Sequence, residues 1–129
     1  MIMKRNTILI LAILVIIISS SSCIWRHNHH SWVNVTESND EYQMCASYDK
    51  HKARRIQNLL KQEFEHDCDE SFSSARIDEE ITLDDNSTFY IRSRPGEIRI
   101  RVDKDDNSEA AVVKIRAVCD DIKEILEDR

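Results

Sequence analysis

The chain is poor in the two residues that shape loops: it has one glycine and one proline among 129 residues. Phosphate-cradling loops, dinucleotide-binding turns and the nucleophile elbow of serine hydrolases all require glycines, because the backbone there approaches a ligand closely or adopts positive φ. The single Gly96 cannot supply any of them. The sequence therefore excludes these nucleotide-binding and serine-hydrolase designs, and we expect no cofactor.

An excess of basic residues is also missing. The formal net charge is −6, and the part from Cys23 onward has 16 Lys and Arg against 24 Asp and Glu, which gives −8. A surface that binds nucleic acid normally carries a positive excess that neutralises phosphates. The composition therefore argues against a nucleic-acid partner, and against adhesion to an anionic membrane by charge alone.

The first 23 residues carry the clearest signal in the chain. Lys4 and Arg5 precede an uncharged apolar run at 7–18, and four serines then lead to Cys23. A basic start, a short apolar core and small residues are typical of an export signal. A helix that crosses a membrane needs roughly 20 apolar residues, so this run of twelve is better suited to a signal peptide.

This segment resembles the signal peptide of bacterial lipoproteins, with Ser20-Ser21-Ser22-Cys23 in the place of their lipobox. The resemblance implies cleavage before Cys23, lipidation of that cysteine, and a membrane-anchored location in the periplasm or at the outer membrane. Two alternatives stay open, namely an uncleaved signal anchor over residues 8–25 and simple secretion. Lys4 and Arg5 place the amino terminus in the cytoplasm in every case, so the remaining chain is expected outside it.

The chain divides into a signal peptide (1–22), a polar tether (23–40) and one small α+β domain (41–129). Alternating apolar residues predict strands at 41–48, 77–83, 87–93 and 97–103. Apolar stripes at helical spacing predict helices at 49–65 and 108–127. The order β-α-β-β-β-α predicts a two-layer sandwich, in which both helices cover one face of a mostly antiparallel four-stranded sheet.

Three local features refine this prediction. Val33 and Val35 alternate with polar residues and could add a short strand within the tether. The pair Pro95-Gly96 suits a type II turn. Residues 106–109 (Asp-Asn-Ser-Glu) are interpreted as a capping box, in which Asp106 bonds the first amides of the last helix.

With Cys23 assigned to lipid, three cysteines remain: Cys45, Cys68 and Cys119. Outside the cytoplasm two of them could form a disulfide, and the pairing stays open. Cys68 is expected to take part because it lies in a loop, whereas Cys119 lies on an apolar helix stripe and suits a buried position.

The tether holds the histidines His27, His29 and His30, which are weak metal ligands at most. A metal site there would have to order a flexible segment at an entropic cost, so a solvated tether is the simpler interpretation.

The outer sheet face is where we expect a partner to bind. Tyr90, Arg92, Arg99 and Arg101, with Arg94 beside them, would all point to solvent on the predicted strands. Guanidinium groups bind carboxylate or phosphate bidentately. The alternative is that they pair across strands with Asp78 and Glu80, which is ordinary decoration of a sheet.

These features predict a non-catalytic binding or accessory module on the extracytoplasmic side of a membrane, whose partner is another envelope protein. One alternative is a hydrolase or transferase that uses carboxylates and His66. Another is a secreted or signal-anchored glycoprotein, because Asn34-Val35-Thr36 and Asn86-Ser87-Thr88 are both glycosylation acceptor sequences.

Overall fold

The computed structural model describes residues 31–68 and 71–128. Three predicted features lie outside these residues: the signal peptide at 1–22, the lipidation site Cys23, and the cluster of His27, His29 and His30.

The described chain forms one open antiparallel sheet with two α-helices, so the predicted α+β class is confirmed. The sheet has five strands, however, and not four. Their bounds are β1 Trp32–Glu37, β2 Glu41–Ser47, β3 Ile77–Thr82, β4 Thr88–Arg94 and β5 Glu97–Asp103. They lie side by side in the order β1-β2-β5-β4-β3, and every neighbouring pair is antiparallel.

The fifth strand is β1, which lies within the segment that was expected to be a tether. It pairs with β2 in a regular register, so that Val33 lies opposite Ala46 and Val35 opposite Met44. The pairing satisfies backbone groups of β2 that would otherwise form an open sheet edge. The Ser38 hydroxyl accepts a hydrogen bond from the Glu41 amide (3.2 Å) and closes the turn between the two strands. The sheet therefore begins at Trp32 and not at Glu41.

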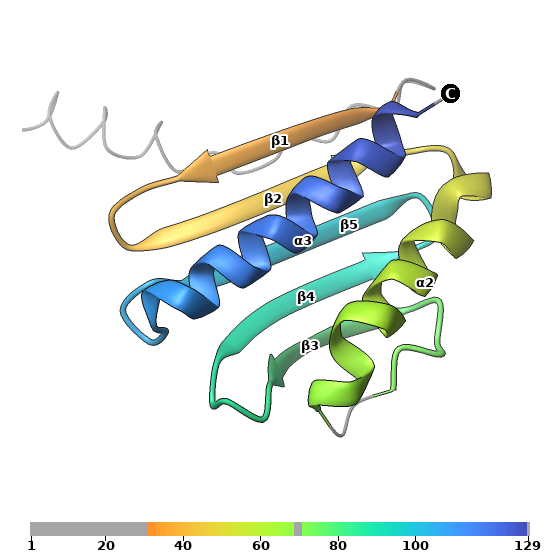
Figure 1. The fold of residues 1–129 in the computed structure, drawn as a ribbon. Helices are drawn as coiled ribbons and strands as arrows, with labels where there is room; N and C mark the ends of the chain where they lie inside the picture. Colours follow the sequence, from red (N-terminus) through yellow and green to blue (C-terminus); the bar gives the residue numbers. More distant parts are fainter. Residues whose placement is uncertain (1–30, 69–70, 129) are drawn as a thin grey trace, which may run out of the picture.

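Both helices cover the same face of the sheet, as predicted (Figure 1). α2 (Ala53–Phe64) is flanked by two short 3₁₀ turns, η1 (Lys50–Lys52) and η2 (Glu65–Asp67), and α3 (Glu109–Glu127) lies over β2 and β5. The Asp49 carboxylate accepts the His51 amide (3.1 Å) before η1. Within residues 31–68 and 71–128, no helix is both long and apolar enough to cross a membrane.

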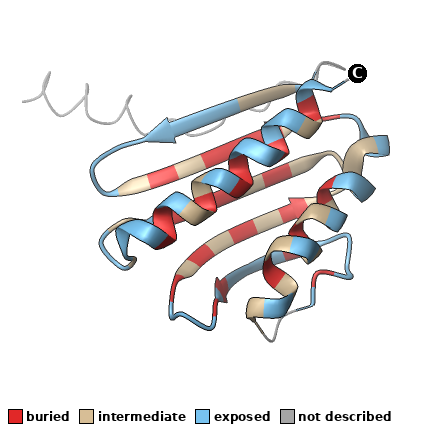
Figure 2. Ribbon diagram, in the orientation of Figure 1, coloured by how far each residue is buried: buried red, intermediate tan, exposed pale blue. Residues whose placement is uncertain are grey.

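The core lies between the helices and the sheet. Figure 2 shows buried positions alternating along β4 and β5, with β1 largely exposed at the edge. Phe64 of α2 is fully buried, and its ring centroid is 4.7 Å from that of Phe89 and 5.9 Å from that of Phe72. The predicted apolar stripe of α3 is also buried, since Val112, Ile115, Val118, Cys119, Ile122 and Leu126 all contribute to the core.

The start of α3 differs from the predicted capping box. Its cap is Ser108, whose hydroxyl accepts the Ala111 amide (3.1 Å), and not Asp106. Asn107 instead binds β4: its carbonyl accepts the Thr88 amide (2.8 Å), and its amide donates to the Thr88 carbonyl (2.9 Å). Adjacent Asp, Asn and Ser residues can all cap a helix, so tertiary contacts decide which of them does.

The turn between β4 and β5 has two residues, Pro95 and Gly96. Gly96 has a φ of +96°, which is the positive value that the second central residue of a type II turn requires. A β-carbon at this position would lie 3.3 Å from the Tyr48 carbonyl oxygen. The only glycine of the chain is therefore used for a tight hairpin.

Candidate partner-binding face

The predicted surface residues lie together on the sheet face that the helices leave uncovered. Tyr90 is the register partner of Arg101, and Arg92 that of Arg99, across the central β4–β5 pair. Each alternates along its strand with buried residues such as Ile91 and Ile100. We call Tyr90, Arg92, Arg94, Arg99 and Arg101 the arginine face.

The guanidinium groups of this face make few interactions within the protein. Among residues 31–68 and 71–128, no carboxylate lies within 4.0 Å of Arg92, Arg94, Arg99 or Arg101. Arg101 instead lies over the Tyr90 ring, 5.1 Å from its centroid, which is a cation–π geometry. The alternative of cross-strand ion pairing is therefore not how these arginines are arranged.

Tyr90 takes the place of an arginine in the contact with β3. Its hydroxyl donates to the Asp78 carboxylate (2.5 Å), although Asp78 is the register partner of Arg92. This hydrogen bond is the main reason that the pKa of Tyr90 lies above its usual value. The contact leaves Arg92 without this carboxylate as a partner, and its Nε is buried with no hydrogen-bond partner among the described residues.

Acidic residues border the arginine face. Asp78 and Glu80 of β3 lie on one side, Glu97 lies beside Arg94 at the turn, and Glu41 and Asp103 lie opposite each other at the far end. A long polyanion would meet repulsion at this border, whereas a short acidic segment with basic neighbours would be attracted to both regions.

The cysteines differ in their chemical state. Cys45 is disulfide-bonded and 4% exposed, on the same uncovered face as Arg99, its register partner. Cys119 is a buried thiol, and Cys68 carries a thiol where a disulfide was expected. The Cys68 thiol donates to the Phe64 carbonyl (3.3 Å), and burial raises the pKa of the Cys119 thiol to about 12.

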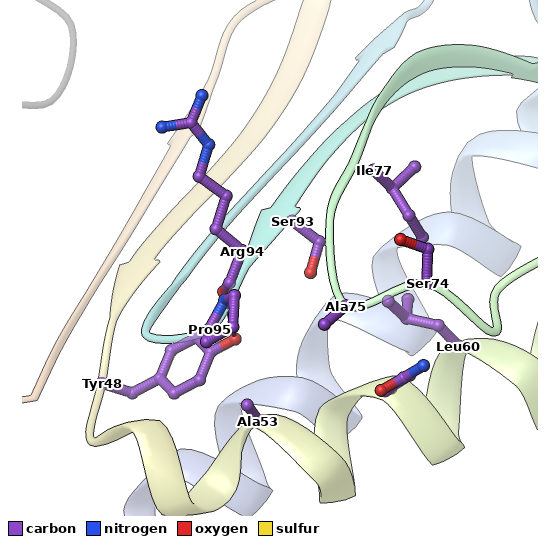
Figure 3. A pocket seen from close by; sticks show the side chains of 10 residues that line it. Tyr48, Ala53, Leu60, Ser74, Ala75, Ile77, Ser93, Arg94 and Pro95 are labelled. Carbon is purple, nitrogen blue, oxygen red and sulfur yellow. Dashed lines mark hydrogen bonds between the residues drawn. The ribbon is translucent and has the colours of Figure 1, made fainter.

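A pocket lies between the start of α2 and the β4–β5 turn (Figure 3). The Tyr48 hydroxyl donates to the Arg94 carbonyl (3.2 Å), and the Gln57 amide donates to the carbonyls of Phe72 (3.0 Å) and Ser73 (2.6 Å). The space inside is about 10 Å³, the lower limit for one water molecule. Its polar groups already bind one another, so we assign it no ligand.

His66, which the hydrolase alternative would use, is exposed in η2. In the part of the chain that the structure describes, it makes no hydrogen bond or ion pair, and no three His, Cys, Asp or Glu side chains are arranged to hold a metal ion. Among the described residues, no carboxylate or other polar side chain forms a hydrogen bond or ion pair with His66 that could support catalysis.

A further charged cluster was not predicted because it depends on β1. Glu37 binds Lys104 (3.1 Å) and also accepts a hydrogen bond from Arg116 of α3. The guanidinium of Arg116 lies over the Tyr42 ring, 5.5 Å from its centroid. These contacts, led by the hydrogen bond from Lys104, hold the pKa of Glu37 below its usual value. The cluster links β1, at the edge of the sheet, to α3.

We expect this cluster to weaken in acid. Because the folded pKa of Glu37 is depressed, its stabilising effect is present above the unfolded pKa of about 4.3 and is lost as the pH falls through the folded pKa. A carboxylate NMR titration should find the Glu37 pKa below the usual value, and higher in Lys104→Met. Arg54→Gln, on the exposed side of α2, should leave it unchanged. An ordinary pKa in the unmodified protein would contradict this.

No protein-family model matches this chain, and neither the curated proteins nor the solved structures contain a match. The protein is therefore classified by its fold alone. It is an α+β domain with an open five-stranded sheet, helices on one face and arginines on the other.

Proposed function

We propose that this protein is an export-targeted, extracytoplasmic module that works by binding another protein through its arginine face. The observation that carries the proposal is a set of four arginines on the sheet face opposite the helices, on the central β4–β5 pair and at its turn, that form no ion pair among the described residues. The other face is covered by α2 and α3, and neither of these helices lies on the face that carries the arginines (Figure 1).

The partner is proposed to present an acidic segment flanked by basic side chains. Carboxylates would bind Arg92 and Arg99 bidentately, and the basic flanks would lie against the acidic border. The negative charge of the chain and the acidic border disfavour nucleic acid. An envelope protein is the proposed source of such a segment, because the export signal sends the domain outside the cytoplasm.

The extracytoplasmic address has support from Cys45. Disulfides form and persist outside the cytoplasm and are rare within it, and Cys45 is disulfide-bonded. Both sequon asparagines, Asn34 and Asn86, are exposed, which suits the glycoprotein alternative. A gel shift of the native protein on treatment with a glycosidase would favour that alternative without altering the proposed binding face.

A charge-reversal experiment tests the proposed function. The probe is a synthetic peptide with glutamates at its centre and lysines at both ends, and the control peptide has glutamines in place of the glutamates. We expect the full-length protein in detergent to bind the first peptide more tightly than the second, and high salt to weaken binding. The double variant Arg92→Glu with Arg99→Glu should lose about tenfold or more in affinity, since charge-assisted hydrogen bonds contribute about 1.5–3 kcal/mol each.

The matched control is Arg54→Glu, a reversal on the exposed side of α2 that should leave affinity unchanged. A denaturation curve for each variant establishes that the fold is retained. Equal affinity for both peptides, or an equal loss in Arg54→Glu, would contradict binding through the arginine face.

A further inference from the structure

The two edge strands of the sheet, β1 and β3, differ in their charge. β3 has three consecutive exposed carboxylates, on Asp78, Glu79 and Glu80. Charged residues on an edge strand oppose its pairing with another chain, as do proline and β-bulges. β1 contains no Lys, Arg or Pro, and its register with β2 is regular over the whole strand, without a bulge. β1 therefore lacks the features that protect a sheet edge.

The one charge of β1 is neutralised within the protein. Glu37 binds Lys104 (3.1 Å) and accepts a hydrogen bond from Arg116. The residues before it, Asn34, Val35 and Thr36, are all exposed, and Val35 is 44% exposed. Alternate amides and carbonyls of an antiparallel strand point away from its neighbour. β1 thus presents backbone hydrogen-bonding groups and an apolar side chain at an edge without net charge.

We propose that β1 pairs with β1 of a second copy of this chain, antiparallel, so that two five-stranded sheets become one continuous sheet. Residues that face each other across an antiparallel pair lie on the same face of the sheet. Two copies of one strand meet this condition when the facing residue numbers have an even sum. The proposed register places Asn34 opposite Asn34 of the second copy, and Val33 opposite Val35 of the second copy.

The valines select this register. Val33 and Val35 lie on the helix side of the sheet, because their register partners Ala46 and Met44 are buried in the core. In the proposed register the two Val33–Val35 pairs are adjacent and bury the exposed Val35 of each copy. A register with Val35 opposite Val35 would instead place the Glu37 carboxylate against Val33. Pairs of β-branched side chains across strands stabilise a sheet, so the valine-paired register is favoured.

This pairing has a consequence for partner binding. The two-fold axis is perpendicular to the sheet, so the helices of both copies lie on one side and both arginine faces lie on the other. A partner with two acidic segments could bind both copies at once, which gives a higher overall affinity than one site provides. The dimer itself rests on β1 and not on the arginine face.

Sedimentation equilibrium of the full-length protein in density-matched detergent tests the proposal. We expect a concentration-dependent equilibrium between monomer and dimer. Val35→Lys should weaken dimerisation about tenfold or more, because it removes both valine pairs and adds a charge to the edge. The matched control is Val113→Lys, at a 52% exposed valine of α3, which should leave the dissociation constant unchanged. A urea denaturation curve for each variant establishes that the fold is retained.

NMR identifies the paired residues independently of any variant. In a mixture of isotope-labelled and unlabelled copies of the unmodified protein, we expect intermolecular contacts between the methyl groups of Val33 and Val35. A monomer at the concentrations used for NMR, a dimer that Val35→Lys leaves intact, or intermolecular contacts confined to other elements would each overturn the proposal. None of these results would affect the peptide-binding test of the arginine face, and a failure of that test would leave the dimer measurement valid.

Discussion

Replacing Phe64 with alanine is expected to lower the free energy of unfolding by about 3–5 kcal/mol, the usual cost of truncating a buried phenylalanine. Phe64 is fully buried, and its ring contacts those of Phe72 and Phe89. It thus joins α2 to β4 and to the segment before β3. A small domain has about 5–15 kcal/mol of stability in total, so this single change should leave it close to unfolding.

Urea denaturation of the full-length protein measures this effect. The control is Val113→Ala on α3, because Val113 is 52% exposed and a surface change of this kind should alter stability by less than about 0.5 kcal/mol. If Phe64→Ala were no more destabilising than Val113→Ala, that result would contradict the packing of α2 against the sheet through Phe64.

Replacing Asn107 with alanine should lower the free energy of unfolding by about 2–3 kcal/mol, because three hydrogen bonds at about 1 kcal/mol each would be lost. Its side chain binds both backbone groups of Thr88 and also donates to the Asp103 carbonyl (2.7 Å). These bonds join the start of β4 to the connection between β5 and α3. Hydrogen exchange should show the largest change at the Thr88 amide.

The comparison for this prediction is Asn58→Ala, an asparagine exposed on α2. Alanine has the higher helix propensity, so this change should leave the protein equally or slightly more stable. A similar loss of stability in both variants would show that the Asn107 contacts have no special role. Protection of Thr88 that is unchanged in Asn107→Ala would lead to the same conclusion.

Much of the fold could be predicted because its elements have strong periodic patterns. The alternation of Ile98, Ile100 and Val102 fixed both the extent of β5 and the face it buries. The stripe of Ile56, Leu60 and Phe64 indicated the buried face of α2, although the predicted helix began at residue 49 and α2 begins at Ala53. Both patterns depend only on which side of an element contacts the core, and that information is local.

The features that were missed depend on contacts between distant residues. β1 has no fully buried residue, so its position depends on pairing with the edge of β2 and on the contact of Glu37 with α3. The cap of α3 was wrongly assigned to Asp106 because neighbouring Asp, Asn and Ser residues can all cap a helix. No pattern could have distinguished these outcomes without the positions of β2 and β4.

The candidate site was predictable to a similar degree. Alternation predicted that Arg92, Arg99 and Arg101 lie on the face opposite the buried Ile91 and Ile100, and the strand register agrees with this. Whether these arginines bind neighbouring carboxylates depends on side-chain conformation, which the sequence does not show. In the structure it is Tyr90, and not an arginine, that binds Asp78. The state of Cys45 was equally inaccessible, since cysteine pairing does not follow from sequence spacing.

The measurement that tests the central claim most directly is a map of where an acidic segment binds. Backbone amide signals of the full-length protein would be followed by NMR while the glutamate-centred peptide is added. The account predicts shifts concentrated in β4 and β5 around Arg92 and Arg99, and none with the glutamine control peptide. Shifts concentrated instead on α2 and α3, or no shifts with either peptide, would contradict the proposal that the arginine face binds a partner.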